Sequence, residues 1–472
     1  MKPLSGLDAV FLYAETPHNP MSVIATVIVE GTLAFEEVVA RIEARLPLLP
    51  PFRRRLVEMP FGLDHPVWVE DAGFDVREHV TRVSAPAPGD DRALERVVGR
   101  IARRRLDRAR PLWEIAFVEG LCDERSALVI KAHHAALDGV SGAAMLLHLF
   151  DREGAAEPSD DWRPEAEPEP ASLLGDGLSR LSGRPRAWKD ALRHGLRGAA
   201  QITRSQLAHD APLRNAAWPF QAPRSPFNGP LSARRSVAYA RARLASVNRA
   251  REVFGGTIND VVLAACSHAL RAELLERGPA PEGPLIAAIP VSTRSLEDEA
   301  DCGNRISAFL TQLPVQHEDP IHQLAEVVRA SRRGKHFHRA LGDRTLAAFA
   351  EIAAPGLVRG AFQLYERWKL ANSHAPLCNV LISNVPGPRE SLHLLGRRVN
   401  ALHPHGPLME GTGLNITVMS YDGSIDVGIL GCDERLPETH RLADRIAVAL
   451  EEFGKLADAE LPDVPSIVRA VA

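Results

Sequence analysis

The chain has few lysines, only scattered cysteines and no long run of apolar residues. Its five cysteines never form a CxxC pair, which disfavours a zinc site and a disulfide framework and predicts free thiols in a reducing compartment. No stretch of about 18 apolar residues is present, so no membrane-spanning helix is expected. The N-terminal residues include Asp8 and Glu15 and lack the apolar core of a signal peptide. These absences predict a cytoplasmic protein and leave contact with a lipid surface open.

The chain also lacks an excess of positive or negative charge. The 56 Lys and Arg residues against 60 Asp and Glu give a formal net charge of −4. A near-neutral chain of this kind argues against nucleic acid as the main partner. Hydrophobic residues make up 45% and charged residues 25%, which is typical of a globular protein and not of a disordered, coiled-coil or collagen-like one. A length of 472 residues predicts two or three domains.

Strand-like and helix-like patterns alternate in two parts of the chain, residues 1–150 and 223–472. Runs of β-branched residues predict strands, and apolar residues at helical spacing predict helices. Strands are expected at 21–30, 113–119, 127–132, 236–243, 285–291, 379–383, 414–419 and 425–429. Helices are expected at 35–46, 94–106, 141–150, 259–270, 326–337, 346–353 and 439–453. The alternation predicts an α/β fold of two halves joined by a linker.

The connecting segment 151–222 differs in composition from both halves. Residues 151–172 are acidic and rich in proline, which is typical of an exposed linker. Residues 173–206 combine many arginines with apolar residues at helical spacing. This second stretch predicts a basic amphipathic helix, which lies either on anionic lipid or on one face of the protein itself.

The most distinctive motif is His133-His134-Ala135-Ala136-Leu137-Asp138-Gly139, directly after the apolar run 127–132. A histidine that leaves a buried strand can face a cleft, and its ordinary pKa near 6.5 suits a general base at neutral pH. Asp138 is expected in a tight turn, in which Gly139 tolerates a positive φ. The histidine pair, the carboxylate and the glycine together favour a catalytic base.

Two other interpretations of this motif stay open. His133, His134 and Asp138 could bind a metal ion, but adjacent histidines rarely reach one ion and no HExxH motif accompanies them. The histidine pair could also be structural. No GxSxG elbow is present, which disfavours a covalent acyl-enzyme. The sequence also lacks a Walker A loop and a GxGxxG after a strand, which disfavours nucleotide cofactors.

HHxxxDG resembles the motif of the CoA-dependent acyltransferase superfamily, which includes chloramphenicol acetyltransferase and the condensation domains of peptide synthetases. The whole chain is similar to bacterial wax ester synthase/diacylglycerol acyltransferases. The N-terminal half shares LSGLDAVFLYAETPHNPMSV (4–23), PPFRRRL (50–56) and PLWEIAFVEGL (111–121) with them. The C-terminal half shares PRSPFNGPLSARR (223–235), TINDVVLA (257–264), PVSTR (290–294), GNRIS (303–307) and SNVPGP (383–388). HHxxxDG alone indicates the superfamily, and the ordered set indicates the family.

The resemblance implies two chloramphenicol-acetyltransferase-like domains, each a mixed β-sheet flanked by helices, with the active site in a tunnel between them. It implies transfer of a fatty acyl group from acyl-CoA to diacylglycerol or to a long-chain alcohol, without a cofactor or metal. His134 would be the general base, which removes the hydroxyl proton and then protonates the departing CoA sulfur. The implied surroundings are the cytoplasm, with a peripheral position at the inner membrane or on lipid droplets.

Further residues are candidates for supporting roles. In the superfamily the aspartate of the motif pairs with an arginine, so Asp138 would pair with Arg53, or else with Arg55, and shape the loop. The resemblance suggests that Asn259-Asp260 supports the active site, and both residue types also suit a helix N-cap. Asn384 or neighbouring backbone N–H groups could stabilise the tetrahedral oxyanion, although this segment also suits a plain turn.

Two alternative functions are also considered. The chain could esterify another alcohol, such as a polyketide or peptide intermediate. It could instead bind acyl-CoA or lipid without catalysis, but the intact HHAALDG argues against a loss of catalysis. The choice between acceptor alcohols depends on the shape of the tunnel and not on the motif.

Overall fold

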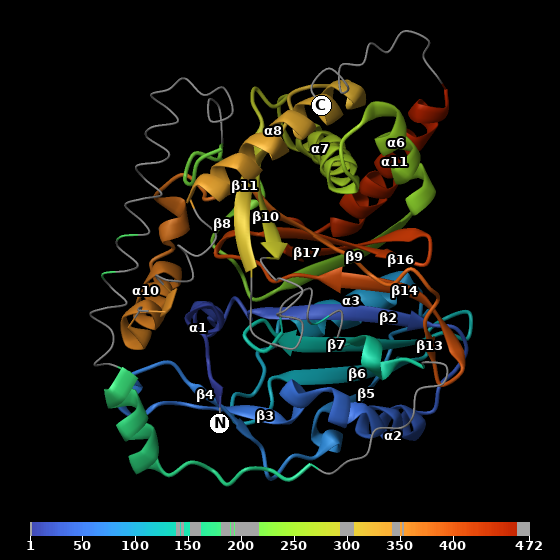
Figure 1. The fold of residues 1–472 in the computed structure, drawn as a ribbon. Coiled ribbons are helices and arrows are strands. Elements are labelled where there is room, and N and C mark those ends of the chain that lie inside the picture. Colours follow the sequence, from blue (N-terminus) through green and yellow to red (C-terminus); the bar gives the residue numbers. More distant parts are fainter. Residues whose placement is uncertain are drawn as a thin grey trace.

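The computed structural model describes residues 2–137, 142, 146–151, 162–180, 189, 193, 217–292, 306–341, 350–351 and 354–459. Their strands form two six-stranded sheets and two smaller sheets (Figure 1). Both large sheets are mixed and are covered by helices, so the fold belongs to the α/β class that the sequence predicts.

The first large sheet has the strand order β13-β14-β2-β7-β6-β5, in which only β5 and β6 run parallel. Its strands are β13 (His393–Leu394), β14 (Arg397–His405), β2 (Ser22–Val29), β7 (Ser126–His133), β6 (Trp113–Glu119) and β5 (Val80–Ser84). Helix α2 (Phe35–Arg45) covers one face and α3 (Asp91–Ala102) covers the other. Strand β7 is therefore buried on both faces, which explains its continuous apolar run.

The second large sheet has the order β11-β10-β12-β16-β17-β9, in which β10, β12 and β16 run parallel. Its strands are β11 (Ile306–Leu313), β10 (Leu285–Ser292), β12 (Val380–Val385), β16 (Leu414–Tyr421), β17 (Ser424–Cys432) and β9 (Arg235–Arg243). Four helices pack on one face and build the largest apolar cluster, namely α6 (Leu244–Phe254), α7 (Ile258–Arg277), α8 (Pro320–Leu341) and α11 (Thr439–Asp458).

Strand β14 connects the two halves, because it comes from the C-terminal part of the sequence but pairs with β2 in the first sheet. The Leu402 N–H donates to Asp426 Oδ2 of β17 at 2.8 Å. Gly428 of β17 lies so close to β14 that a Cβ there would collide with the Pro404 carbonyl. The expected boundaries at residues 150 and 223 do not show that β14 joins the first sheet. The alternation of apolar residues along a strand predicts the strand but not the sheet to which it belongs.

Smaller elements lie beside the large sheets (Figure 1). Two small sheets comprise β1 (Lys2–Pro3), β4 (Val67–Glu70) and β3 (Arg54–Val57), and β15 (Gly411–Thr412) and β8 (Asn228–Gly229). Helices α1 (Gly6–Ala14) and α10 (Pro355–Arg367) pack together. The 3₁₀ turns are η1 (Leu46–Leu48), η2 (Pro50–Arg53), η3 (Pro60–Gly62), η4 (Val76–Glu78), η5 (Leu147–Leu149) and η8 (Leu370–Asn372).

The structure confirms the expected strands and the helices at 35–46, 259–270, 326–337 and 439–453. Three of these helices are longer than expected, because α7 continues to Arg277, α8 begins at Pro320 and α11 continues to Asp458. Helix α3 begins and ends earlier than the expected range 94–106. The expected helices at 141–150 and 346–353 lie mostly outside the described residues. Strands β3, β4, β5, β11 and β14 and helices α1, α6 and α10 were not expected.

The connecting segment is described only in part. Residues 170–180 are helical, and Leu173 packs against Met59, Val67 and Val69. Of the predicted amphipathic stretch 173–206, residues 181–188, 190–192 and 194–206 lie outside the described residues. The described beginning of this stretch therefore lies on one face of the protein.

Within the described ranges, no single helix combines the length and hydrophobicity needed to cross a bilayer. The pair α6 and α7, bent by 102° at its break, reaches that length and composition only when both helices are taken together.

Candidate active site

The histidine motif begins at the end of β7. His133 is the last residue of this strand and pairs with Ser22 of β2. The chain then turns, with the Ala136 N–H donating to the His133 carbonyl at 2.9 Å. The His134 N–H donates to the Met21 carbonyl at 2.8 Å. The residue directly before β2 therefore fixes the turn that carries His134.

The imidazole of His133 is sealed in the interior. Its Nδ1 accepts the Ala135 N–H at 3.0 Å, so the proton of the neutral ring is on Nε2. Among the described residues, Nε2 has no hydrogen-bond partner. Burial, followed by the positive charge of Arg108, holds the pKa of His133 well below its ordinary value. His133 is therefore neutral and holds the turn, and it is poorly suited to take up a proton.

The His134 ring stacks face to face on Phe11 of α1, with ring centroids 4.0 Å apart and planes inclined by 7°. Helix α1 begins at its N-cap Ser5, whose side chain accepts the Asp8 N–H at 3.1 Å. Leu12 of the same helix packs in one apolar cluster with Ala135. Helix α1 thus sets the plane of the second histidine, a role that the sequence did not assign to it.

Arg108 is a second residue that sequence reasoning missed, because arginines are abundant throughout the chain. Its Nη2 donates to the Glu15 carboxylate at 2.6 Å and to the Leu12 carbonyl at 2.7 Å. The guanidinium therefore ties the C-terminal end of α1 in place and brings positive charge close to His133.

Lys131 anchors the same strand from inside the protein. Its fully buried Nζ donates to the Ile101 carbonyl at 3.1 Å, to the Arg104 carbonyl at 2.5 Å and to Glu114 Oε1 at 3.1 Å. Burial lowers the pKa of this amine, and Glu114 opposes that shift. The C-terminal end of α3 is thereby fixed to β7 two residues before the motif.

Arg53 lies beside the end of β7. The Phe52 carbonyl accepts the Trp113 indole N–H at 2.8 Å, and Trp113 pairs with Ala132. The buried Arg53 guanidinium lies 4.7 Å from the centre of the Trp162 ring. The aromatic residue of the connecting segment therefore packs against this arginine.

The predicted partner of Arg53, Asp138, and the adjacent Gly139 lie outside the described residues. The pairing of Asp138 with Arg53 therefore stays a prediction. Arg55, the second candidate, lies 2.7 Å from a Glu167 oxygen and 3.8 Å from an Asp71 oxygen. These two carboxylates make Arg55 the weaker candidate.

Asn384 lies on β12, in register with Val418 of β16. The next residues of these strands, Val385 and Met419, pack in one apolar cluster with Ala132 and Leu137 of the N-terminal half. Tyr421, two residues after Met419, donates its hydroxyl to the Val399 carbonyl at 2.8 Å, so this end of β16 packs against β14. A position of Asn384 beside the histidine motif stays a prediction.

Asn259-Asp260 does not form the N-cap of α7, because the cap is Thr257. Asp260 is the acidic residue of a capping box, in which its Oδ2 accepts the Thr257 N–H at 2.9 Å. The Asp260 N–H in turn donates to Thr257 Oγ1 at 3.2 Å. The hydrogen bonds of Asp260 within the described residues thus close the first turn of a core helix.

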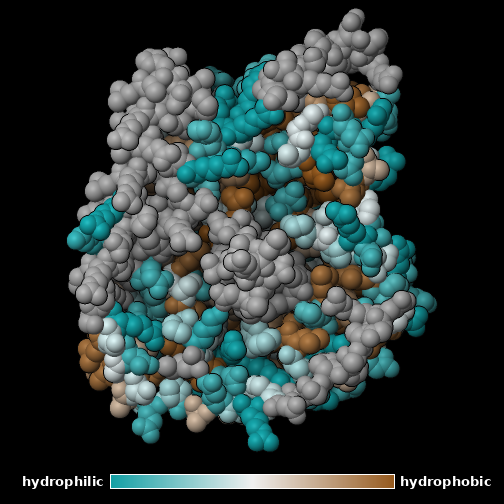
Figure 2. All heavy atoms as spheres, viewed as in Figure 1, coloured by the Kyte–Doolittle hydropathy of each residue, from teal (hydrophilic) through white to brown (hydrophobic). Residues whose placement is uncertain are grey.

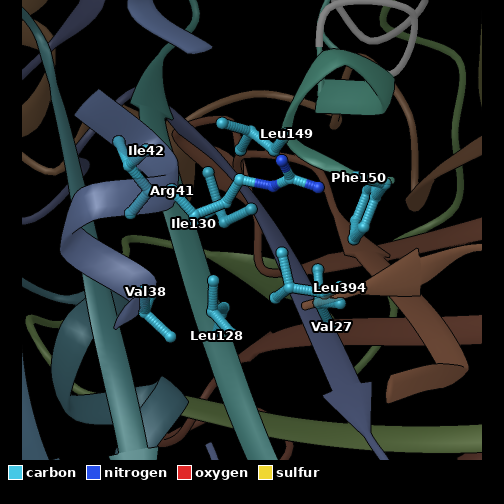
Figure 3. A pocket seen from close by; sticks show the side chains of 9 residues that line it. All are labelled: Val27, Val38, Arg41, Ile42, Leu128, Ile130, Leu149, Phe150 and Leu394. Atoms are coloured by element: carbon cyan, nitrogen blue, oxygen red, sulfur yellow. The ribbon is translucent and has the colours of Figure 1, made fainter. Parts of the chain in front are cut away.

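An apolar pocket lies next to β7, on the face covered by α2 (Figure 3). It is small, with a cavity volume of about 10 Å³, which is room for about one water molecule. Its walls are Val27, Val38, Arg41, Ile42, Leu128, Ile130, Leu149, Phe150 and Leu394. Arg41, the one charged side chain of the lining, pairs with Asp151. Most of these walls belong to the apolar cluster that also contains Ala132 and Leu137.

Among the described residues, no group of three or more His, Cys, Asp and Glu side chains could hold a metal ion. Asp138, the third ligand of the alternative metal site, lies outside them.

Comparison with solved structures first defines the class. The first condensation domain of the calcium-dependent antibiotic synthetase aligns with a TM-score of 0.58 at 14% identity, covering 100% of this chain and 97% of that chain. A wax ester synthase/diacylglycerol acyltransferase from Marinobacter aquaeolei VT8 aligns with a TM-score of 0.66 at 26% identity, covering 97% and 100%. The fold is thus that of the condensation-like, chloramphenicol-acetyltransferase-like enzymes, as the sequence predicted.

Comparison of sequences then gives the family. Residues 4–262 match the wax ester synthase/diacylglycerol acyltransferase catalytic domain, and residues 302–454 match its C-terminal domain. A Mycobacterium tuberculosis protein, provisionally named a diacylglycerol O-acyltransferase, is 36% identical over 470 residues, covering 97% of this chain and 91% of that protein. Another from the same species is 34% identical over 454 residues, covering 94% and 93%. The chain belongs to the wax ester synthase/diacylglycerol acyltransferase family and is an acyltransferase.

Proposed function

We propose that this acyltransferase moves a fatty acyl group from acyl-CoA to the hydroxyl of diacylglycerol, of a long-chain alcohol, or of both. The products are triacylglycerol and wax ester, respectively. The observation that carries the proposal is the place of His134, in a fixed turn at the end of β7 with its ring held by Phe11. The names of the relatives support the choice of substrates.

His134 is the general base of the proposed reaction. Its imidazole removes the proton of the acceptor hydroxyl while that oxygen attacks the thioester carbonyl. The tetrahedral intermediate then expels the CoA thiolate, which takes the proton back from His134. The ester and free CoA leave, and no covalent acyl-enzyme, cofactor or metal ion takes part.

The neighbouring residues position this base. His133 holds the turn through its bond to the Ala135 N–H. Asp138 and Gly139 shape the following loop, with Arg53 as the partner of the carboxylate. Asn384 or backbone N–H groups near it stabilise the oxyanion.

A product assay tests the proposed reaction. Purified protein receives labelled palmitoyl-CoA with dioleoylglycerol, with hexadecanol, or with neither. We expect labelled ester from the wild type with at least one acceptor, and a loss of about 10²–10⁴-fold in kcat for His134→Ala. His322→Ala, at a half-exposed histidine of α8, is the matched control.

Two outcomes would contradict the proposal. Undiminished ester formation by a folded His134→Ala variant would exclude His134 as the base. Free fatty acid as the only product, with every alcohol offered, would exclude the transfer to a lipid acceptor. The ratio of the two esters identifies the preferred alcohol.

A further inference from the structure

Arg235, the first residue of β9, is a charged side chain in the interior of the protein. Figure 2 shows hydrophilic side chains spread over the described surface of both halves, whereas only 8% of Arg235 is exposed. A buried charge is costly unless hydrogen bonds compensate it, so the contacts of a buried arginine indicate what it does. The proposed reaction has so far given this residue no role.

The guanidinium of Arg235 donates hydrogen bonds to three backbone carbonyls. Nη1 donates to the carbonyl of Ser232 and, at 3.0 Å, to that of Arg234, both directly upstream in the sequence. Nη2 donates to the carbonyl of His18, which is 217 residues away. Among the described residues no carboxylate forms an ion pair with this guanidinium. Two bonds thus fix Arg235 in its own half, and the third reaches the N-terminal half.

His18 lies between α1 and β2, in residues 15–21, which we name the α1–β2 segment. Two backbone hydrogen bonds, at 3.1 and 3.2 Å, join Thr16 and Asn19 and close a tight turn that contains His18. Because Arg235 binds the carbonyl inside this turn, it holds the α1–β2 segment at its tip.

Two contacts of His134 come from this part of the chain. Met21, the last residue of the α1–β2 segment, accepts the His134 N–H at 2.8 Å. Phe11 of α1, directly before the segment, stacks on the His134 ring with centroids 4.0 Å apart. A shift of the α1–β2 segment would therefore move groups that hold both the backbone and the ring of the proposed base.

Helix α10 of the C-terminal half holds the same segment at a second point. The Glu366 carboxylate accepts the His18 N–H at 3.2 Å and lies 2.9 Å from His18 Nδ1. Val358 and Phe362 of α10 pack in one apolar cluster with Leu12 of α1 (Figure 1). The side chain of His18 is 50% exposed, so its ion pair with Glu366 is a weaker link than the buried Arg235.

We propose that Arg235 is a positioning residue for His134. It holds the α1–β2 segment by the His18 carbonyl, and this segment and α1 hold the base through Met21 and Phe11. The C-terminal half thereby contributes to catalysis through a residue that acts on the base from a distance. This role rests on the proposed function, in which His134 is the general base.

Steady-state kinetics on Arg235→Met tests this role, because the change keeps an unbranched apolar stem and removes the donor to His18. A misplaced base can lower a rate about 10²-fold, so we expect kcat to fall about ten- to a hundredfold. We expect the KM for acyl-CoA to stay within about twofold, because the substrate sites are unchanged. Arg234→Met is the matched control. The Arg234 side chain is 65% exposed and pairs with Asp433, and we expect the kcat of the wild type.

A double-mutant cycle shows whether Arg235 acts through His134. The residual rate of His134→Ala is measured at high enzyme concentration, alone and combined with Arg235→Met. We expect the second change to lower this residual rate by less than about twofold, because the base is already absent. A loss as large as in the wild-type background would show that Arg235 acts independently of His134, and would overturn the proposal.

Hydrogen exchange gives a readout that does not depend on catalysis. We expect the His134 N–H to exchange at least about fivefold faster in Arg235→Met, while the amides of β16 keep their protection. If Arg235→Met does not fold, Arg235→Gln replaces it. Its amide can donate to the carbonyls nearby but is too short to reach His18, and we expect the same changes.

The outcomes separate this role from the proposed function. Undiminished ester formation by His134→Ala would contradict the proposed function and, with it, the catalytic role of Arg235. A loss of activity in His134→Ala, with wild-type kcat and wild-type exchange at His134 in a folded Arg235 variant, would overturn the role of Arg235 alone.

Discussion

The imidazole of His133 is enclosed by the N-terminal sheet, where burial and the charge of Arg108 hold its pKa well below the ordinary value. The imidazole of His134, one residue further on, lies in a turn and stacks on Phe11. The two imidazoles thus have different surroundings, because His133 ends β7 and His134 lies in the turn after it. At the scale of single residues, the motif depends on the neutral His133 and on Phe11 for its geometry.

The stacking contact can be tested directly. Phe11→Leu keeps an apolar side chain on α1 but removes the face-to-face contact with His134. We expect a decrease of about 1 kcal/mol in the free energy of unfolding. We expect a decrease in kcat of about ten- to a hundredfold with little change in KM, because the base is no longer held in line.

Urea unfolding and steady-state kinetics on the same preparations measure both effects. Phe35→Leu is the control, since Phe35 contacts Phe117 at a centroid distance of 6.1 Å and not the motif. An unaltered kcat in a folded Phe11→Leu variant would show that the stack does not position the base.

At the scale of elements, the first turn of α7 shows how one short sequence can suit two roles. Asn259-Asp260 suits a helix N-cap and resembles a supporting motif of the family. The structure places Thr257 at the N-cap and Asp260 in the capping box. The capping role is thereby shown for Asp260, and a role of Asn259 in the active site stays a prediction.

Removal of the cap separates these roles. Thr257→Ala removes the side chain that accepts the Asp260 N–H, and we expect a loss of about 1 kcal/mol in the free energy of unfolding. We expect the kcat of the folded variant to match the wild type well below its melting temperature. A fall in kcat for Thr257→Ala that equals the fall for Asn259→Ala would instead place the whole turn in the catalytic machinery.

At the scale of the whole molecule, β14 and the residues that it buries join the two halves. His405 of this strand lies in the interior beside Tyr239 of β9, with ring centroids 5.5 Å apart. Burial, and then the neighbouring His403, lowers the pKa of His405 to about 3. Burial also lowers the pKa of His403, despite the nearby Asp426.

These shifts predict acid sensitivity with a definite sign. His405 stays neutral in the folded protein, while the unfolded chain takes up a proton below a pH of about 6.5. Its contribution to stability is therefore present above about pH 6.5 and falls as the pH falls toward 3. We expect the free energy of unfolding of His405→Phe to depend less steeply on pH, by about 1.4 kcal/mol per pH unit between about pH 6 and 4.

Urea titrations at several pH values measure these slopes. His322→Gln, at a half-exposed histidine, is the control variant. Equal slopes for the wild type and His405→Phe would show that His405 is not held neutral by the fold.

The sequence by itself determined the α/β class, the buried strand before the motif and the family, because apolar periodicity and short motifs are local properties of the chain. It also determined His133 and His134 as the candidate pair. Strands β3, β4 and β5 were not predicted because they are short or show weak alternation. Helix α1 was not predicted because it is short and apolar on nearly all sides, so no helical period stands out.

The tertiary structure decided what depends on residues far apart in the sequence. It enclosed His133 so that its pKa falls well below the ordinary value, brought Phe11 onto His134, and placed β14 in the first sheet beside β2. Such contacts follow from tertiary packing, because the neighbours of each side chain come from distant parts of the sequence.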